Sequence, residues 1–161
     1  MKLYSQCIGK EIRESSTGKV LSTISDLIFD TDRAILKAVI TREDKVLYFS
    51  DVSEWKIRVY IKDEIFFQNI NSCKDISNIL EKKTAIIGAR VENDDGVFLG
   101  YSEDFSFNEK TGSLIQIVVR SYFLNIIPTK KLLISATDIL EITEERILVK
   151  STKVKNAVPD I

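Results

Sequence analysis

The chain has 161 residues, 44% of them hydrophobic, with 23 basic and 24 acidic side chains and no histidine. This balance leaves neither half with the basic excess on which non-specific nucleic-acid binding depends. Without histidine, Ser-His-Asp and Cys-His catalysis and most zinc sites are excluded, so an enzyme would have to use carboxylates, Lys or Tyr. We therefore expect a protein without catalytic activity, metal or cofactor.

Targeting and redox features of the sequence are few. No apolar run is long enough to span a membrane, and residues 1–6 lack the apolar core of a signal peptide. Cys7 and Cys73 are too few for a disulfide framework and have no metal-ligand spacing. These features favour a cytoplasmic protein with reduced thiols, in which both cysteines are core or boundary residues.

The first half of the chain is expected to form short strands separated by polar turns. These strands are predicted over residues 3–8, 11–13, 20–29, 35–40, 46–49, 55–61 and 65–67. Leu21, Leu27 and Phe29 share parity, which places them on one face of their strand, opposite Asp26. Gly18 follows a polar run and can close a hairpin by taking a positive φ without Cβ strain.

The second half repeats this pattern, with strands predicted over residues 114–119, 132–135, 139–142 and 147–149. Leu99, Phe105 and Phe107 share a face opposite Asp104, as their counterparts do in the first half. Such regular short strands indicate small antiparallel barrels rather than alternating β and α units. Because a unit this small buries only about 60% of its unfolded surface, the two are expected to pack on each other or on a partner.

Helical periodicity is found only between the repeats. Ile76, Ile79 and Leu80 form an i, i+3, i+4 stripe, and Ser72 is expected to cap the helix. The predicted organisation is repeat 1 over residues 1–70, a linker with a short helix over 71–84, repeat 2 over 85–151 and a mobile tail over 152–161.

The repeated motif is the most specific feature of the sequence. Its residues are Gly9, Gly18, Asp26, Phe29 and Asp30 in the first copy, and Gly88, Gly96, Leu99, Gly100, Asp104, Phe107 and Asn108 in the second. With the alternating strand and β-turn-β that follow, this pattern resembles the PRC-barrel family over nearly the whole chain, as two tandem copies. The first copy departs from it with Ser22 in place of Gly100 and with extra residues at 55–60, which leaves the pairing of its last strands open.

The resemblance implies a fold and a class of function. It implies two small antiparallel β-barrels that serve as a docking or assembly module. The family includes the cytoplasmic domain of the photosynthetic reaction centre H subunit and the C-terminal domain of the ribosome maturation factor RimM, and its known members bind proteins or larger assemblies. A protein partner or self-association is thus expected, without direct nucleic-acid contact or a small-molecule substrate. The alternative is a ribosome- or RNA-processing-associated accessory factor.

Two acidic features have alternative interpretations. Asp26 and Asp104 could form a catalytic or metal-binding pair, but one Asp at the same place in each repeat favours a structural role, accepting hydrogen bonds from backbone amides. Residues 93–96 resemble the start of a calcium loop. The Glu that completes such a loop is missing, so a polar turn is expected there.

The two copies differ most after their third strand. Residues 42–45 read Arg-Glu-Asp-Lys, whereas residues 122–128 read Tyr-Phe-Leu-Asn-Ile-Ile-Pro. Exposed apolar clusters of this size usually mark interfaces. The candidate surface consists of Tyr122, Phe123, Leu124, Ile126 and Ile127. Either it packs between the two barrels or it binds a partner or a second copy.

Overall fold

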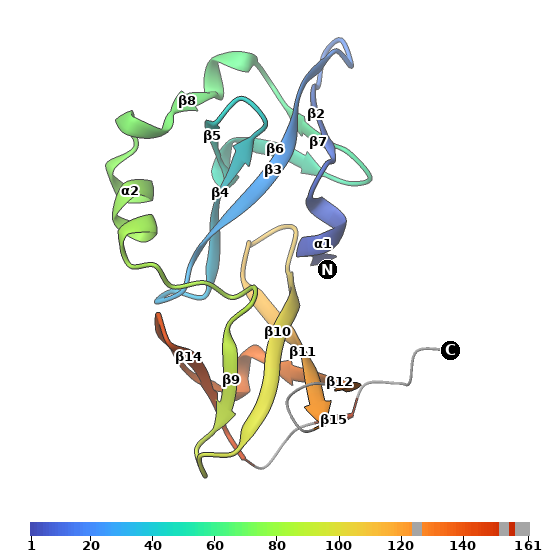
Figure 1. The fold of residues 1–161 in the computed structure, drawn as a ribbon. Helices are drawn as coiled ribbons and strands as arrows, with labels where there is room; N and C mark the ends of the chain where they lie inside the picture. Colours follow the sequence, from blue (N-terminus) through green and yellow to red (C-terminus); the bar gives the residue numbers. More distant parts are fainter. Residues whose placement is uncertain (124–126, 152–154, 157–161) are drawn as a thin grey trace.

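The computed structural model describes residues 1–123, 127–151 and 155–156, most of which lie in strands of two curled sheets (Figure 1). The all-β prediction is confirmed. Within the described ranges, no helix is both long and apolar enough to cross a membrane.

The two sheets are formed by consecutive parts of the chain, here called the first half and the second half. The first half contains β2 (Glu11–Glu14), β3 (Val20–Asp30), β4 (Ile35–Thr41), β5 (Lys45–Tyr48), β6 (Val52–Trp55), β7 (Val59–Ile61) and β8 (Gln68–Asn69). The second half contains β9 (Arg90–Asn93), β10 (Phe98–Phe107), β11 (Leu114–Phe123), β12 (Ile127–Ser135), β13 (Ile139–Ile142), β14 (Arg146–Val149) and β15 (Lys155–Asn156).

Both sheets have the same strand order. The orders are β6-β7-β2-β3-β4-β5-β8 and β13-β14-β9-β10-β11-β12-β15. Each sheet contains one parallel pair, β2 with β7 and β9 with β14, so the expected antiparallel pairing is wrong for this pair in each half. The parallel pair arises because the β6–β7 or β13–β14 hairpin returns to the free side of β2 or β9. This long-range pairing is not reported by strand periodicity.

The sheets also share their irregularities. The pairing of β3 with β4 shifts register between Ile24 and Asp26, and that of β10 with β11 shifts between Ser102 and Asp104. The two pairs shift again before Phe29 and before Phe107. Because a β-bulge re-aims the residues around it, its recurrence at equivalent places shows that the repeated residues define the same backbone twice.

The segment that enters each half packs on the other half. The residues before the first sheet form β1 (Lys2–Leu3) and α1 (Tyr4–Cys7); β1 pairs with β10, and α1 also contacts β10. The segment before the second sheet contains α2 (Lys74–Glu81), which contacts β3. The predicted first-half strand over 3–8 is therefore wrong, because the contacts that set this segment's conformation come from the second sheet. In Figure 1 the N-terminus lies where the halves meet.

Two equivalent turns join the halves by a reciprocal pair of hydrogen bonds. The Leu36 amide donates to the Gly112 carbonyl at 2.8 Å, and the Leu114 amide donates to the Ala34 carbonyl at 2.9 Å. Leu36 and Leu114 are matching residues of β4 and β11, and Ala34 and Gly112 are matching turn residues with φ of 52° and 74°. The halves are thus related by an approximate two-fold axis at this point, like the partners of a symmetric dimer.

The larger hydrophobic core of the described residues spans both halves. Phe29 contacts Phe105 edge-on with ring centroids 5.3 Å apart, and Trp55 contacts Phe107 at the same distance. Phe107 is fully buried, and burying a side chain of this size contributes about 1.5–3 kcal/mol. The predicted inward faces are confirmed, since Leu27 and Phe29 join this core together with Phe105 and Phe107.

Helix α2 covers the part of the first sheet's outer face that β3, β4 and β5 form. Ile76 is fully buried against Ile28, Ala38 and Val46, while Leu80 remains 45% exposed. Ser72 does not cap this helix: it ends the 3-10 turn η3 (Ile70–Ser72), and the residue at the N-cap position is Cys73. Local sequence did not reveal this extra turn, which shifts the start of the helix.

The late strands of the first half differ from the prediction. The expected strand over 55–61 is instead the β6–β7 hairpin, and the expected strand over 65–67 is largely the 3-10 turn η2 (Glu64–Phe66). Two further 3-10 turns, η1 (Phe49–Asp51) and η4 (Ala136–Asp138), occupy equivalent places in the two halves. Within the predicted mobile tail, β15 pairs with β12 and belongs to the second sheet; the other residues of 152–161 lie outside the described ranges.

Candidate protein-interaction site

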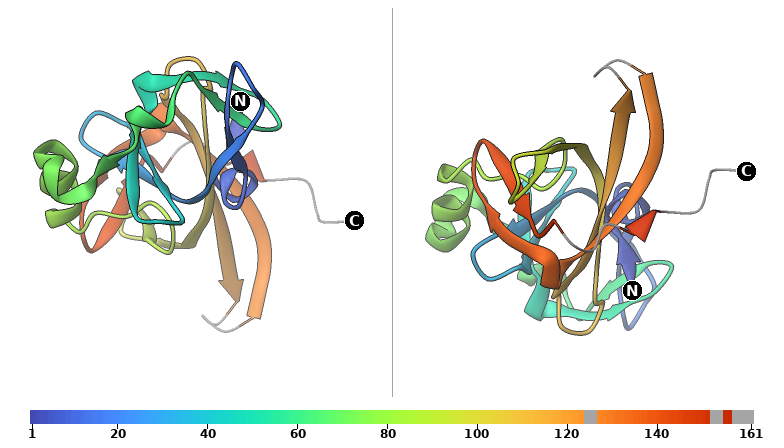
Figure 2. Two further views of the ribbon diagram at one scale, coloured as in Figure 1. Left: turned by 90° about the horizontal axis from the view of Figure 1, so that it is seen from above. Right: turned by 90° about the horizontal axis from the view of Figure 1, so that it is seen from below.

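The largest difference between the halves is the hairpin formed by β11 and β12. Three residues join Thr41 to Lys45 in the first half, whereas twelve join Val119 to its strand partner Leu132 in the second. The extra residues lengthen both strands into what we call the arm, whose described residues are 120–123 and 127–131. Figure 2 shows the arm projecting sideways from the second half.

Gly100 allows the arm to leave the sheet. Gly100 has φ of +140°, and a Cβ added there would lie 2.0 Å from the carbonyl oxygen of Arg120. No side chain fits at that distance, so β10 and β11 can approach this closely only with Gly. In the first half the chain turns at Arg42–Asp44 instead, and Ser22, which matches Gly100, donates a hydrogen bond to the Glu43 carboxylate. The departure of Ser22 from the motif thus accompanies the shorter hairpin.

The predicted apolar surface lies on the arm. Tyr122 and Phe123 end β11, and Ile127, which is 56% exposed, begins β12. The described part of this surface therefore does not fill the space between the halves, because the arm points away from their junction (Figure 2). Leu124 and Ile126 lie outside the described residues.

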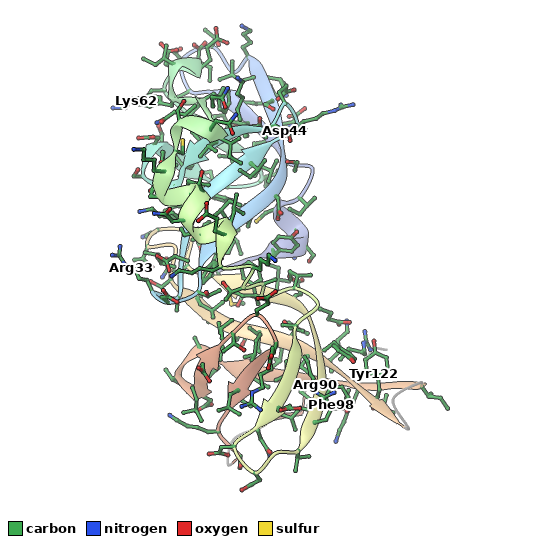
Figure 3. All side chains as sticks on the ribbon, turned by 60° about the vertical axis from the view of Figure 1, so that its left-hand side comes forward. Arg33, Asp44, Lys62, Arg90, Phe98 and Tyr122 are labelled. Atoms are coloured by element: carbon green, nitrogen blue, oxygen red, sulfur yellow. The ribbon has the colours of Figure 1, made fainter. Side chains whose placement is uncertain are left out.

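Aromatic side chains continue from the arm across the outer face of the second sheet. Tyr122 meets Tyr101 edge-on at 6.0 Å between ring centroids, and Tyr101 meets Phe98 at 5.3 Å. The Arg90 guanidinium lies 4.3 Å from the centre of the Phe98 ring, a cation–π contact. Figure 3 shows Arg90, Phe98 and Tyr122 on the same side of the second half. We call Phe98, Tyr101 and Tyr122 the aromatic row.

Arginine and lysine side chains form a line across the same face, because the strand register places them and Tyr101 opposite one another. Arg146 pairs with Arg90, Arg90 with Tyr101, Tyr101 with Arg120, and Arg120 with Lys131. Directly opposite residues share a face, so these five side chains form a line across β14, β9, β10, β11 and β12. At about 4.8 Å between strands, the line is about 19 Å long. We call it the cationic row.

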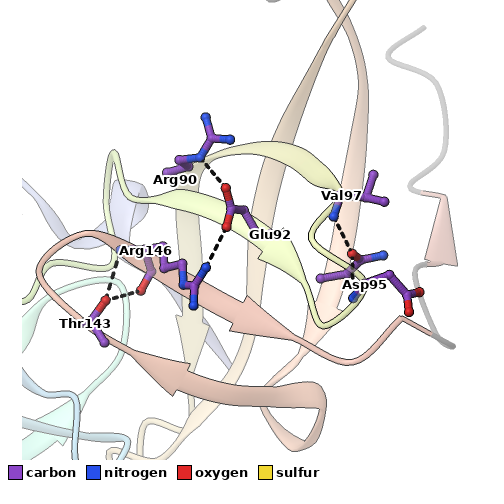
Figure 4. A network of polar contacts seen from close by, with 7 residues as sticks. Arg90, Glu92, Asp95, Val97, Thr143 and Arg146 are labelled. Carbon is purple, nitrogen blue, oxygen red and sulfur yellow. Dashed lines mark hydrogen bonds and ion pairs between the residues drawn. The ribbon is translucent and has the colours of Figure 1, made fainter.

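A carboxylate fixes each end of the cationic row. Glu92 accepts hydrogen bonds from Arg90 Nε at 2.6 Å and from Arg146 Nη1 at 2.9 Å (Figure 4). Glu103 accepts from Arg120 at 3.0 and 3.2 Å and lies 3.4 Å from the Lys131 ammonium. The hydrogen bonds that Glu92 accepts from Arg90, the larger cause, and from Arg146 lower the pKa of its carboxyl group. This carboxylate therefore remains ionised and orients both guanidinium groups.

The first half carries the same kind of triad with the charges exchanged. Glu11 occupies the position of Arg90, and Arg13 occupies that of Glu92. Glu11 accepts from Arg13 and Arg58 at 2.9 and 3.0 Å, which lowers its pKa. Here the outward row has a carboxylate in place of Arg90 and Thr23 in place of Tyr101. The two equivalent surfaces therefore have different chemistry.

Asp26 and Asp104 hold the N-terminal segment at the junction. Each carboxylate accepts from the amide of the next residue, at 2.7 and 2.8 Å, within the shared β-bulge rather than in a turn. Asp26 also accepts from the Tyr4 hydroxyl at 3.0 Å, and Asp104 accepts from the Ser5 amide at 3.1 Å and from the Ser5 hydroxyl. Burial and the nearby Asp26 raise the pKa of Tyr4 to about 12. The two aspartates thus clamp α1 from opposite halves.

The remaining motif residues form turns or core. Gly9, Gly18, Gly88 and Gly96 have φ between 72° and 80°. The side-chain oxygen of Asn93 accepts from the amides of Asp95 and Val97, and the Asp94 carboxylate accepts from Ser151, so residues 93–96 form a polar turn as predicted. Within the described ranges, no group of three or more Cys, Asp or Glu could hold a metal ion. Cys7 and Cys73 are both buried.

A cavity of about 350 Å³ at the junction is the other candidate site. Its polar lining includes Tyr4, Asp26, Thr31 and Thr84. Tyr4 already donates to Asp26, and the two threonine hydroxyls lie 2.8 Å apart in a hydrogen bond. Lys83 is the other polar residue of the lining. Because Tyr4 and Asp26 bond each other, as do Thr31 and Thr84, these four groups offer a ligand fewer partners than the face beside the arm does.

Sequence reasoning identified the arm but missed the two rows beside it. Arg90, Phe98, Tyr101 and Arg146 come from three strands and meet only through register. One sequence signal could have shown part of the site. When the two repeats are aligned, Glu11 and Arg13 correspond to Arg90 and Glu92, so the charge is reversed at both positions. Scaffold residues tend to keep their chemistry between repeats, so an exchange of charge suggests a surface with a specific role.

No known protein family matches this chain, and no curated protein resembles it closely enough to count as a relative. The functional assignment therefore depends on the residues and their geometry.

Proposed function

We propose that this chain is a non-catalytic protein-interaction module of the tandem PRC-barrel type, which binds a partner through the arm and the sheet face beside it. The observation that carries the proposal is the difference between two otherwise equivalent halves. Strand order, bulges and core residues recur, whereas the arm and its aromatic row are found only in the second half. A feature that the scaffold does not need is best explained by binding.

The composition of this surface supports the same function. Tyr101 is 42% exposed and lies opposite Arg90 and Arg120 on the neighbouring strands, and Ile127 on the arm is 56% exposed. Aromatic residues and arginine are the types enriched at the energetic centres of protein interfaces. A projecting hairpin also presents backbone and side chains to a partner without disturbing the core behind it.

The test removes the arm and keeps the scaffold. In a short-turn variant, residues 121–131 are replaced by Glu-Asp, the two residues that follow Arg42 in the first half. The tagged full chain, the short-turn variant and a Glu43→Ala control are used for affinity purification from native cells, with quantitative mass spectrometry. Light scattering of the purified chain tests self-association.

The expected result is a partner, or a second copy, that the full chain and the control retain and the short-turn variant loses. Circular dichroism and thermal unfolding establish that the variant is folded. If the folded short-turn variant retained the same partners as the full chain, the proposal would be wrong.

A further inference from the structure

The face beside the arm has a chemistry that specifies its partner. We propose that the cationic and aromatic rows bind an acidic, tyrosine- or phenylalanine-containing segment of a protein partner, with carboxylates at Arg90 and Arg146 and rings against Tyr101 and Tyr122. This inference rests on the proposed function and names the partner class for the same site.

The guanidinium pair is held ready for an anion. The Glu92 side chain is only 15% exposed, whereas those of Arg90 and Arg146 are each 44% exposed. The carboxylate thus lies beneath two outward-facing guanidinium groups. Arginine has five N–H donors, and the hydrogen bonds to Glu92 use one nitrogen of each side chain, Nε of Arg90 and Nη1 of Arg146. The other donors can receive carboxylates in the bidentate geometry that makes such pairs strong.

The rings supply an apolar surface next to these charges. Tyr101 lies between the guanidinium of Arg90 and the arm, in contact with both Phe98 and Tyr122. A ligand that lies along the cationic row from Arg146 towards the arm therefore contacts the two guanidinium groups first and the aromatic rings next. A peptide that alternates acidic and aromatic residues matches this order.

Geometry favours a peptide over single-stranded nucleic acid. Stacking of successive bases needs open ring faces, but here neighbouring rings meet edge-on at interplanar angles of 68° and 73°. The Arg90 guanidinium already covers one face of Phe98. The chain also carries a net charge of −1, which opposes a polyanion more than it opposes a short peptide with a few carboxylates.

The first half provides a matched control within the same molecule. Its equivalent face has Glu11 where Arg90 stands and Thr23 where Tyr101 stands. The Glu11 side chain is 37% exposed and would repel a ligand carboxylate at the position where Arg90 would attract it. Only the face of the second half should therefore bind the acidic segment.

Fluorescence anisotropy with the full chain tests this proposal. The probes are a labelled peptide of alternating Glu and Tyr, a peptide of alternating Lys and Tyr, and an oligouridylate of equal length. The chain should bind the Glu-Tyr peptide in preference to the other two. Arg90→Gln, Arg146→Gln and Tyr101→Thr should each raise its Kd about tenfold, the loss expected for one charge-assisted or aromatic contact. Arg58→Gln, the control in the first half, should leave Kd unchanged.

Three results would overturn the proposal: no binding of the Glu-Tyr peptide, equal binding by folded variants and wild type, or tighter binding of the oligouridylate that depends on Arg90. Thermal unfolding of each variant separates loss of binding from loss of fold, and the Arg146→Gln variant leaves the aromatic row untouched. If the chain does not bind the Glu-Tyr peptide but its cellular partners still require the arm, the proposed function stands and only the assignment of an acidic partner segment is wrong. If the short-turn variant keeps its partners, the proposed function fails whatever the peptide does.

Discussion

The two halves of this chain have the same strand order and β-bulges but carry different side chains on their outer faces. Both place an arginine–carboxylate–arginine triad on the outer face of the sheet, but Glu11 and Arg13 in the first half become Arg90 and Glu92 in the second. The first half closes its central hairpin at Arg42–Asp44, whereas the second extends it into the arm. What the halves share is needed for folding, and what distinguishes them identifies the residues available for function.

The comparison also shows that the halves are not independent domains. They exchange entry segments, share one core and join through the reciprocal hydrogen bonds of Ala34 and Gly112. Duplication has therefore produced an interface resembling that of a symmetric dimer within one chain, and this interface leaves the outer faces free to differ.

The largest effect is expected from separating the halves. Residues 1–82 and 83–161, expressed alone, should each fail to fold cooperatively, because each loses the segment and the aromatic contacts that the other supplies. The intact chain should unfold in a single transition. Circular dichroism and calorimetry measure both. A well-folded isolated half, or two resolved transitions in the intact chain, would contradict the shared core.

Gly100→Ala should destabilise the chain by about 3 kcal/mol, because the new Cβ collides with the Arg120 carbonyl and the positive φ adds strain. The matched change Ser22→Ala removes the hydrogen bonds from its hydroxyl to the Glu43 carboxylate and to the Thr23 carbonyl at 3.4 Å, and should cost about 1 kcal/mol. Urea denaturation compares the two. Equal losses would show that the close approach of β10 and β11 is not what requires Gly at this position.

The matching turn residues Ala34 and Gly112 should respond in opposite directions. Ala34 has a left-handed φ of 52°, so Ala34→Gly should relieve strain and stabilise the chain by about 1 kcal/mol. Gly112→Ala should destabilise it by a similar amount, since its Cβ would lie 3.1 Å from the Leu36 carbonyl oxygen. Thermal unfolding midpoints measure both. A shift of the same sign in the two variants would disprove the equivalence of the turns.

The smallest effect concerns pH. The folded-state pKa values of Glu11 and Glu92 are lowered by their arginines, so each contributes stability above the ordinary Glu pKa, about 4.3, and loses it as the pH falls through the folded value. Glu92→Gln should weaken this acid dependence more than Glu11→Gln, because Glu92 is 15% exposed and Glu11 is 37% exposed. Urea midpoints recorded at falling pH rank the two. A greater effect of Glu11→Gln would reverse the ranking.

Much of the scaffold could be predicted from the sequence. Alternating parity located β3, β4 and β11, because a half-buried strand must place its apolar residues on one face. The recurrence of Gly, Asp and Phe predicted two similar halves. Segments 3–8 and 55–61 were predicted wrongly, since their conformations are set by pairing with strands far away in the sequence.

The candidate site was predicted only where it is local. Tyr122 and Ile127 belong to an apolar run that can be recognised in the sequence. Arg90, Tyr101 and Arg146 lie far apart in the sequence, and only the register of the strands shows that they share a face. Asp26 and Asp104 were assigned a structural role, and the structure adds the segment that they hold, α1.

The sequence by itself determined the all-β class, the duplication and the place where the copies diverge, because these depend on periodicity and on the order of residues along the chain. Tertiary structure decided the exchange of entry segments, the core shared by both halves and the alignment of the cationic and aromatic rows. Each of these depends on which strands become neighbours, and that choice is made by the burial of the whole chain rather than by any one segment.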